Sequence, residues 1–144
     1  MQNVTELLKS KPPRPMVTVK PEDTVLDAIK VLAREDVGAA VVVTGEQLVG
    51  IFSERDYTRK VVLKGRSSES TRVEEIMSAN VICVSPRTKT RDCMALMSEK
   101  NIRHLPVVEE GRVIGMVSIR DIVTDIIADQ DFTISQLESY ISGQ

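Results

Sequence analysis

The sequence predicts an α/β fold made of two tandem copies of one unit, each with the element order β-α-β-β-α, related by pseudo-twofold symmetry. The motif G-x-x-S-x-R-D occurs twice, as GIFSERD at residues 50–56 and GMVSIRD at residues 115–121. A gap-free shift of 65 residues aligns 16–65 with 81–130 and leaves nine positions identical. A unit of about fifty residues has too small a core to fold alone, so the two copies are expected to pack together.

Each unit begins with a short extended segment, residues 16–19 or 81–84, which leads through a proline turn into a helix. In the first copy this helix carries apolar side chains at helical spacing, and these are Val25, Ala28, Ile29 and Leu32. Two apolar runs joined by a short polar turn then predict a β-hairpin. The second strand ends in the serine of the repeated motif, and a second helix follows over residues 54–64 or 119–129.

Amphipathic segments flank the pair, NVTELL near the N-terminus and TISQLESYI near the C-terminus. The second of these is expected to cover the core or to form a subunit contact. The predicted organisation is an N-terminal helix and linker, a first repeat, a polar linker, a second repeat and a C-terminal helix; the boundaries are 1–15, 16–65, 66–80, 81–130 and 131–144.

The composition argues against several classes of protein. There are 19 basic and 21 acidic residues, no tryptophan and only four other aromatic residues, so neither the charge nor the stacking surface of a nucleic-acid binder is present. The apolar runs are far shorter than the ~20 residues that a membrane helix needs, and no hydrophobic signal core is found. We therefore expect a cytoplasmic protein without membrane or nucleic-acid partners.

Reactive side chains are scarce. The single histidine, His104, argues against a zinc site and against a nucleophilic triad, so no catalytic residue and no metal ligand is assigned. Cys83 and Cys93 are not accompanied by a second cysteine or histidine group, and both are expected to be buried thiols in a reducing compartment.

The repeated motif has two interpretations. A serine followed three residues later by an acid is the capping box that satisfies the free N–H groups at a helix start. Alternatively, a strand that ends in serine and opens a helix can receive a phosphate, while the aspartate one turn later holds a ribose diol. The motif alone leaves both open.

With LPVV at residues 105–108 and the doubled G-h-h-S-x-x-D motif, the chain resembles the CBS-domain pair, or Bateman module. The run SERDYTRKVVLKGRSS further resembles the stand-alone pairs of bacteria and plant organelles. The resemblance implies a non-enzymatic signal-transduction protein that binds AMP, ADP, ATP, NAD or S-adenosylmethionine in two clefts between the repeats. It also implies a disc-shaped homodimer and an effector protein, whose identity the sequence does not give.

Carried over by position, the resemblance assigns the ribose to Asp121 and the phosphate to Ser118. It places Arg103 and His104 at basic phosphate contacts of the same cleft, although His104 is equally interpretable as a partly exposed residue at a strand end. The adenine of this cleft is expected against the other repeat, and its neighbours are Met16, Val17, Val37 and Gly38, with Met116 behind it.

The pseudo-symmetric cleft keeps Ser53 and Asp56 but has Gly38 and Ala39 where the second copy has Arg103 and His104. This cleft is therefore expected to be the weaker one, or to take its cation from elsewhere; the candidates are Arg55, Lys60, Lys64 and Arg66, with the linker serines Ser67 and Ser68. The repeated Arg55 and Arg120 either reach a phosphate or pair with a surface acid.

Two other functions stay open at this stage. One is a constitutive protein-interaction or redox-linked module without nucleotide dependence, in which the repeated Ser and Asp only cap helices. The other is a small nucleotide-processing enzyme, against which stand the single histidine and the absence of a P-loop.

Overall fold

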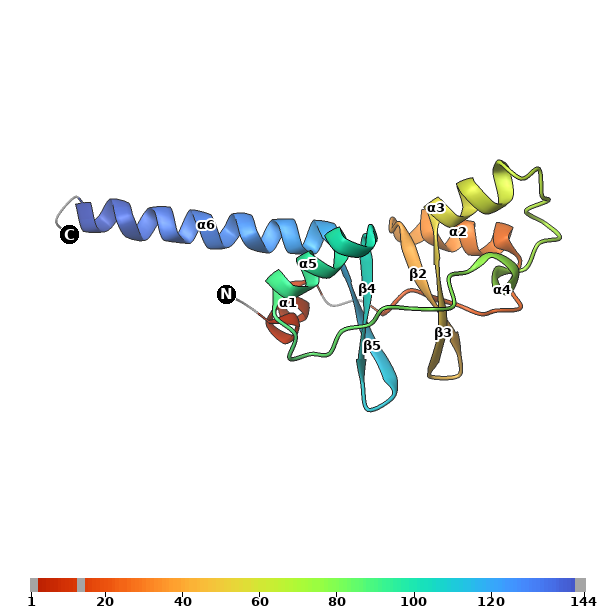
Figure 1. Ribbon diagram of the computed structural model, residues 1–144, viewed down its shortest axis with the longest axis horizontal. Helices are drawn as coiled ribbons and strands as arrows, with labels where there is room; N and C mark the ends of the chain where they lie inside the picture. Colours follow the sequence, from red (N-terminus) through yellow and green to blue (C-terminus); the bar gives the residue numbers. More distant parts are fainter. Residues whose placement is uncertain (1–2, 13–14, 142–144) are drawn as a thin grey trace.

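The computed structural model describes residues 3–12 and 15–141. In chain order its elements are α1 (Val4–Ser10), β1 (Thr18–Val19), α2 (Val25–Glu35), β2 (Ala39–Thr44), β3 (Gln47–Ser53), α3 (Glu54–Tyr57), the π-helical segment η1 (Thr58–Val62), α4 (Val73–Ile76), α5 (Thr90–Lys100), β4 (His104–Glu109), β5 (Arg112–Ser118) and α6 (Ile119–Ile141). The two hairpins lie side by side with their turns at the same end, and the long α6 projects from the second repeat (Figure 1).

The predicted repeat is confirmed down to local irregularities. In the first copy β1 pairs parallel with β2, which pairs antiparallel with β3; in the second copy β4 and β5 form the hairpin and Val84 makes a single parallel bridge to Val107. Each hairpin shifts register after its fourth residue, after Val42 and after Val107. Helices α2 and α5 both end at a residue in the left-handed conformation, Asp36 and Asn101, each with φ 53°.

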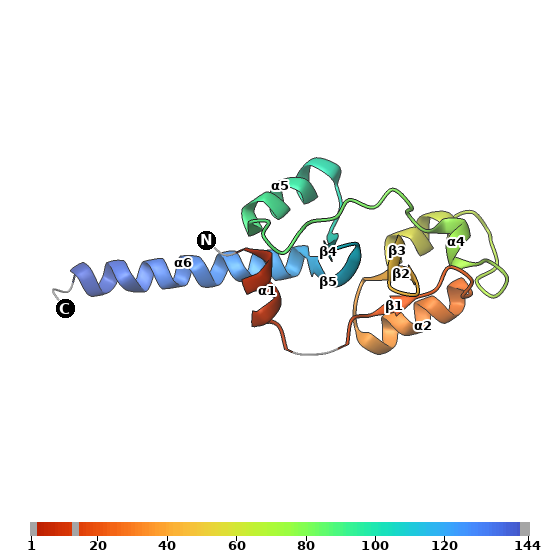
Figure 2. The same ribbon diagram turned by 90° about the horizontal axis from the view of Figure 1, so that it is seen from below.

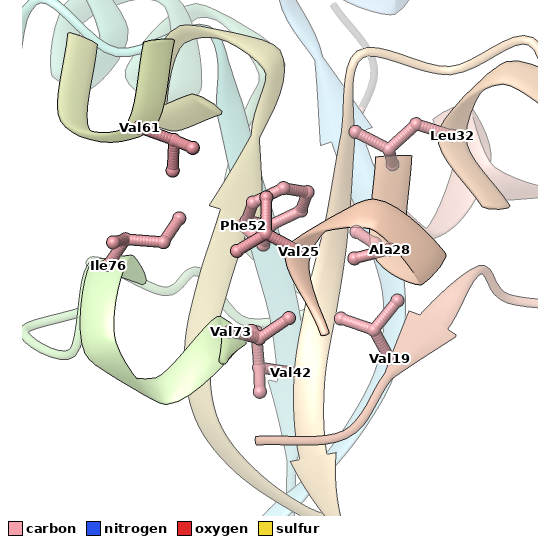
Figure 3. Close-up of a cluster of buried hydrophobic side chains, with 10 residues drawn as sticks. Val19, Val25, Ala28, Leu32, Val42, Phe52, Val61, Val73 and Ile76 are labelled. Carbon is pink, nitrogen blue, oxygen red and sulfur yellow. The ribbon is translucent and has the colours of Figure 1, made fainter. Parts of the chain in front are cut away.

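The hydrophobic core is divided into two clusters, one for each repeat. The first gathers around Phe52, whose ring lies between α2 and α4 (Figure 3). Its other buried members are Val19, Val25, Ala28, Leu32, Ala40, Val42, Val61, Val73 and Ile76. Three of the four residues predicted for the buried face of α2 are fully buried and Ile29 is half-buried, as the helical spacing predicts.

Each core is completed by a short helix that lies outside the predicted repeat boundaries. Val73 and Ile76 of α4 close the first cluster, and Val4 and Leu7 of α1 close the second. Backbone hydrogen bonds connect the same segments. The Val73 N–H donates to the Asp23 carbonyl at 2.9 Å, and the Val4 N–H donates to the Thr88 carbonyl at 2.8 Å. Helix α1 thus serves the second repeat and α4 the first, which interlocks the two units.

The helices α1 and α4 also explain the glycine of the repeated motif. A Cβ on Gly50 would lie 2.6 Å from the Sδ of Met77, which follows α4, and a Cβ on Gly115 would lie 3.2 Å from Leu8 of α1. A Cβ on Gly50 would therefore force the Met77 side chain to move, and it would also lie 3.1 Å from the Ser78 carbonyl, a backbone atom.

The C-terminal part of the chain differs from the prediction. Residues 119–129 and the flanking segment 131–144 were expected as separate helices, but α6 is continuous from Ile119 to Ile141. No glycine or proline occurs between these two residues, so nothing in the sequence ends the helix there. Figure 2 shows α6 extending well beyond the body of the second repeat.

The prediction that both cysteines are buried is wrong for one of them. Cys93 on α5 is fully buried, and burial raises the pKa of its thiol to about 11. Cys83 is exposed; it precedes Val84, which makes a single strand bridge to Val107. Partial burial of its sulfur still raises the pKa of the thiol by desolvation. Neither cysteine has the lowered pKa that a reactive thiolate requires.

Candidate functional site

A cleft of about 350 Å³ opens between the two repeats at the start of α3. The first repeat contributes the end of β3 and the first turn of α3, and the second repeat contributes its first extended segment and the loop before β4. The lining residues are Gly38, Ile51, Ser53, Glu54, Arg55, Asp56, Ser78, Asn80, Val81, Ile82, Ile102, Arg103 and His104. We call this the Asp56 cleft.

Asp56 is buried and held in place by a capping box. Its Oδ2 accepts hydrogen bonds from the Ser53 backbone N–H and from the Ser53 hydroxyl, each at 3.0 Å, while the Asp56 N–H donates to Ser53 Oγ at 3.1 Å. The capping interpretation of the motif is therefore confirmed. It leaves the second interpretation open, because the carboxylate still borders the cleft.

Lys60 has a different position from the one proposed for it as a phosphate ligand. Its Nζ lies 3.1 Å from Asp56 Oδ1 and donates to the Ile76 carbonyl at 3.0 Å. Of the other candidate cations, Arg66 pairs with Glu75, and Lys64 is exposed. Among the described residues lining the cleft, the basic side chains are therefore Arg55, Arg103 and His104.

The structure brings Arg103 and His104 to a cleft to which they were not assigned. Arg103 and His104 were assigned to the cleft of Asp121, and the cleft of Asp56 was expected to lack cations. Both residues line the Asp56 cleft, because the loop before β4 lies opposite the start of α3. They also lie beside the second motif, since His104 pairs with Ser118 across the β4–β5 hairpin and the Ile119 N–H donates to the Arg103 carbonyl at 2.8 Å. Arg55 reaches across the same boundary and donates from Nη1 to the Asn101 carbonyl at 3.0 Å.

His104 lies where the two repeats meet. Its ring approaches Gly38, with Cε1 3.5 Å from the position of a Cβ on that glycine. Burial lowers the pKa of His104; Arg103 and Lys11 lower it further, and Asp121 opposes them. His104 is therefore neutral at pH 7 and offers the cleft a hydrogen-bonding imidazole rather than a third cation beside Arg55 and Arg103.

The lowered pKa of His104 predicts how stability depends on pH. The unfolded chain takes up a proton near the ordinary value of 6.5, whereas the folded chain does so only at lower pH. The contribution of His104 is thus present above pH 6.5 and is lost as the pH falls below it. Urea unfolding of the wild type and of His104→Gln at pH 7.5, 6.5 and 5.5 should show a smaller loss of unfolding free energy on acidification in the variant. An identical loss in both would contradict this assignment.

The second copy of the motif has the same cap but a different neighbour. The Ser118 N–H donates to Asp121 Oδ2 at 2.9 Å, and the Asp121 N–H donates to Ser118 Oγ at 3.2 Å. Lys11, from the segment after α1, pairs with the same Oδ2 at 2.9 Å and also donates to the Met116 carbonyl at 3.1 Å. The end of the N-terminal segment therefore already contacts the groups expected to receive the ribose.

The residues predicted to surround the adenine beside Asp121 have the following surroundings. Gly38 lines the Asp56 cleft, Val17 and Val37 pack against the first core, and Met16 lines a separate hollow between the hairpin ends. Arg120 is exposed.

Sequence reasoning missed the apolar wall of the Asp56 cleft, although the repeat contained the signal. The 65-residue shift relates Met16 to Val81, Val17 to Ile82, Val37 to Ile102 and Met116 to Ile51, and these four counterparts all line the cleft. Applying the symmetry to both clefts would have found them. Ser78 and Asn80 lie in the linker, outside the aligned copies, and had no such signal.

Within residues 3–12 and 15–141 there is no group of three or more His, Cys, Asp or Glu side chains placed to hold a metal ion. Over the same residues no helix is both long and apolar enough to cross a membrane.

The family follows from a match that covers most of the chain. The model of the CBS domain matches residues 4–63 and 73–128. The chain belongs to the CBS domain family. The two matched segments begin at α1 and α4, so each CBS domain as matched starts earlier than the repeats predicted at 16–65 and 81–130. The tandem CBS architecture predicted from the sequence is thereby confirmed.

Several CBS proteins are similar to this chain. The mitochondrial CBS domain-containing protein CBSX3 of Arabidopsis thaliana is 46% identical over 127 residues, which are 85% of this chain and 62% of that protein. A structure from Burkholderia ambifaria, described as a candidate signal-transduction protein with CBS domains, is 52% identical with a TM-score of 0.86 and covers 90% of this chain and 96% of its own. A CBS domain protein from Pyrobaculum aerophilum, complexed with AMP, is 28% identical with a TM-score of 0.74 and covers 83% and 89%.

Proposed function

We propose that this CBS-domain protein is a non-enzymatic regulator that binds an adenine nucleotide, AMP, ADP, ATP or NAD, in the Asp56 cleft. One observation carries the proposal. The buried carboxylate of Asp56 on the first repeat and the side chains of Arg103 and His104 on the second repeat line a single cleft of about 350 Å³. This volume is within the range of small-molecule sites. The AMP complex of the Pyrobaculum aerophilum relative supports the same ligand class.

The carboxylate of Asp56 suits a ribose. An ionised carboxylate has about four acceptor positions, and the Ser53 N–H, the Ser53 hydroxyl and Lys60 use three of them. The remaining position lies on Oδ1, the oxygen that Lys60 contacts. A ribose hydroxyl would donate to Oδ1 beside Lys60 or in its place.

The opposite wall suits the phosphate and the base. The Arg103 guanidinium provides a charge-assisted contact for a phosphate, and the neutral His104 imidazole provides a hydrogen bond. A phosphate beside His104 would raise the pKa of the histidine, so binding would be accompanied by proton uptake at mildly acidic pH. Ile82 and Ile102 form an apolar surface for the adenine ring.

Regulation follows from the position of the cleft. A nucleotide that contacts both repeats favours the arrangement in which they are closed on it, and an effector protein that distinguishes this arrangement is coupled to the ligand. The reacting groups of an enzyme are not needed for this role.

Thermal unfolding with AMP, ADP, ATP, NAD, NADH and S-adenosylmethionine tests the proposal. At a ligand concentration of 100 times Kd the native state gains about 2.7 kcal/mol, which raises Tm by several degrees. AMP should stabilise more than adenosine, because only AMP reaches Arg103. Absence of a shift with all six ligands would refute the proposal and favour a nucleotide-independent interaction module; product formation during the assay would favour an enzyme.

A further inference from the structure

Helix α6 carries an apolar line that the body of the protein does not cover. Val123 is 44% exposed, Ile127 is 54% exposed and Ile141 is 81% exposed. The last buried residue of the helix is Asp125, so fifteen residues, 127–141, follow with no buried side chain. A lone helix of this length is marginal in water, and a partner along its apolar line would stabilise it.

The spacing of this line identifies its geometry. It comprises Val123, Ile127, Gln130, Ile134, Leu137 and Ile141, which we call the α6 seam. The steps of four, three, four, three and four residues are those of a heptad repeat, with isoleucine at position a and valine, glutamine and leucine at position d. Ile122, which packs into the second core, lies outside the seam, so the seam is a surface distinct from the core-facing side.

We propose that a second copy of this chain covers the α6 seam, forming a parallel two-stranded coiled coil. The isoleucines at position a and Leu137 at position d support two strands, because β-branched residues at a combined with leucine at d favour dimers over higher assemblies. The other d residues, Val123 and Gln130, do not add to this preference. Position a is occupied by Ile127, Ile134 and Ile141, and Leu137 occupies the d position between the last two.

The charges beside the seam favour the parallel orientation. Asp131 and Glu138 occupy position e, and position g carries Ile126, Thr133 and Tyr140. In a parallel pair each e residue faces a g residue of the other helix, which is uncharged here. In an antiparallel pair e residues face each other, and the carboxylates would repel.

The same charges exclude an acidic membrane surface as the occupant. Between residues 127 and 141 the chain has three acidic residues, Asp129, Asp131 and Glu138, and no lysine or arginine. Helices that lie on anionic membranes are rich in lysine and arginine on their polar face. A second copy is therefore the occupant that the seam and its flanks fit.

The first experiment measures mass in solution for the full chain by sedimentation equilibrium. We expect Ile134→Glu, which puts a charge at position a, to halve the mass of the wild-type assembly. Phe132→Glu is the matched control, because Phe132 lies at position f, opposite the seam, and is 65% exposed; it should leave the mass unchanged. An unchanged mass for Ile134→Glu, or a monomeric wild type, would overturn the proposal.

The second experiment tests the orientation. In a Cys83→Ser background, Leu137→Cys should form a disulfide-linked dimer on mild oxidation, because identical d positions face each other only in a parallel pair. Phe132→Cys should not. Equal cross-linking of the two variants, or none for Leu137→Cys, would contradict the parallel coiled coil. The thermal response to AMP should be the same in Ile134→Glu and wild type, so this proposal and the nucleotide proposal fail separately.

Discussion

Replacing Asp56 with asparagine is expected to weaken AMP binding about tenfold to a hundredfold, which is the range of 1.5–3 kcal/mol for hydrogen bonds to a charged group. Asparagine keeps an oxygen that can accept from the Ser53 N–H, so the cap is retained while the charge is removed. The loss should therefore appear in the Kd for AMP, measured by isothermal titration calorimetry. The Tm of the free protein should fall as well, because Lys60 loses its ion pair with Oδ1.

Asp121→Asn is the matched control for this prediction. Asp121 has the same cap in the second repeat, but Lys11 pairs with its carboxylate, and Asp121 does not line the cleft that Arg103 and His104 border. We expect the Kd for AMP to change by less than about twofold in this variant, a few tenths of a kcal/mol. If Asp121→Asn weakens binding as much as Asp56→Asn does, the ranking of the clefts is wrong.

The second large effect concerns the core that supports the site. Phe52 is fully buried in the first cluster and immediately precedes Ser53 (Figure 3). Phe52→Ala is expected to lower the unfolding free energy by about 3–5 kcal/mol, because the lost apolar contact and the remaining cavity add. Urea unfolding followed by circular dichroism measures this loss.

Leu63→Ala provides the comparison, since Leu63 is 72% exposed and follows η1 in the same repeat. Its unfolding free energy should stay within about 0.5 kcal/mol of the wild type. A loss below about 1 kcal/mol for Phe52→Ala would mean that the first cluster is not the packed core described here.

The repeat was predictable because its determinants are local and doubled. The spacing of apolar residues predicted α2, and the Ser53–Asp56 and Ser118–Asp121 pairs predicted where two helices start. Each of these features depends on residues close together in the sequence. The interlocking of α1 and α4 was missed because it depends on contacts between segments far apart in the chain, such as Val4 with Thr88. The continuity of α6 was missed although the absence of glycine and proline indicated it.

The membership of each cleft could not be predicted from position within one repeat. Arg103 and His104 lie beside LPVV of the second copy, and their nearest motif in the sequence is Ser118–Asp121, to which they were assigned. The packing of the two repeats also places the loop before β4 opposite the start of α3 in the other repeat. Arg103 and His104 are 47 and 48 residues from Asp56 in the sequence, and they nevertheless line the same cleft.

A crystal structure of the full chain grown with AMP would locate the nucleotide. We expect the ribose at Asp56 Oδ1, the phosphate at Arg103 and the adenine against Ile82 and Ile102. AMP bound at Asp121 with Lys11 displaced, while the Asp56 cleft contains only solvent, would contradict this expectation.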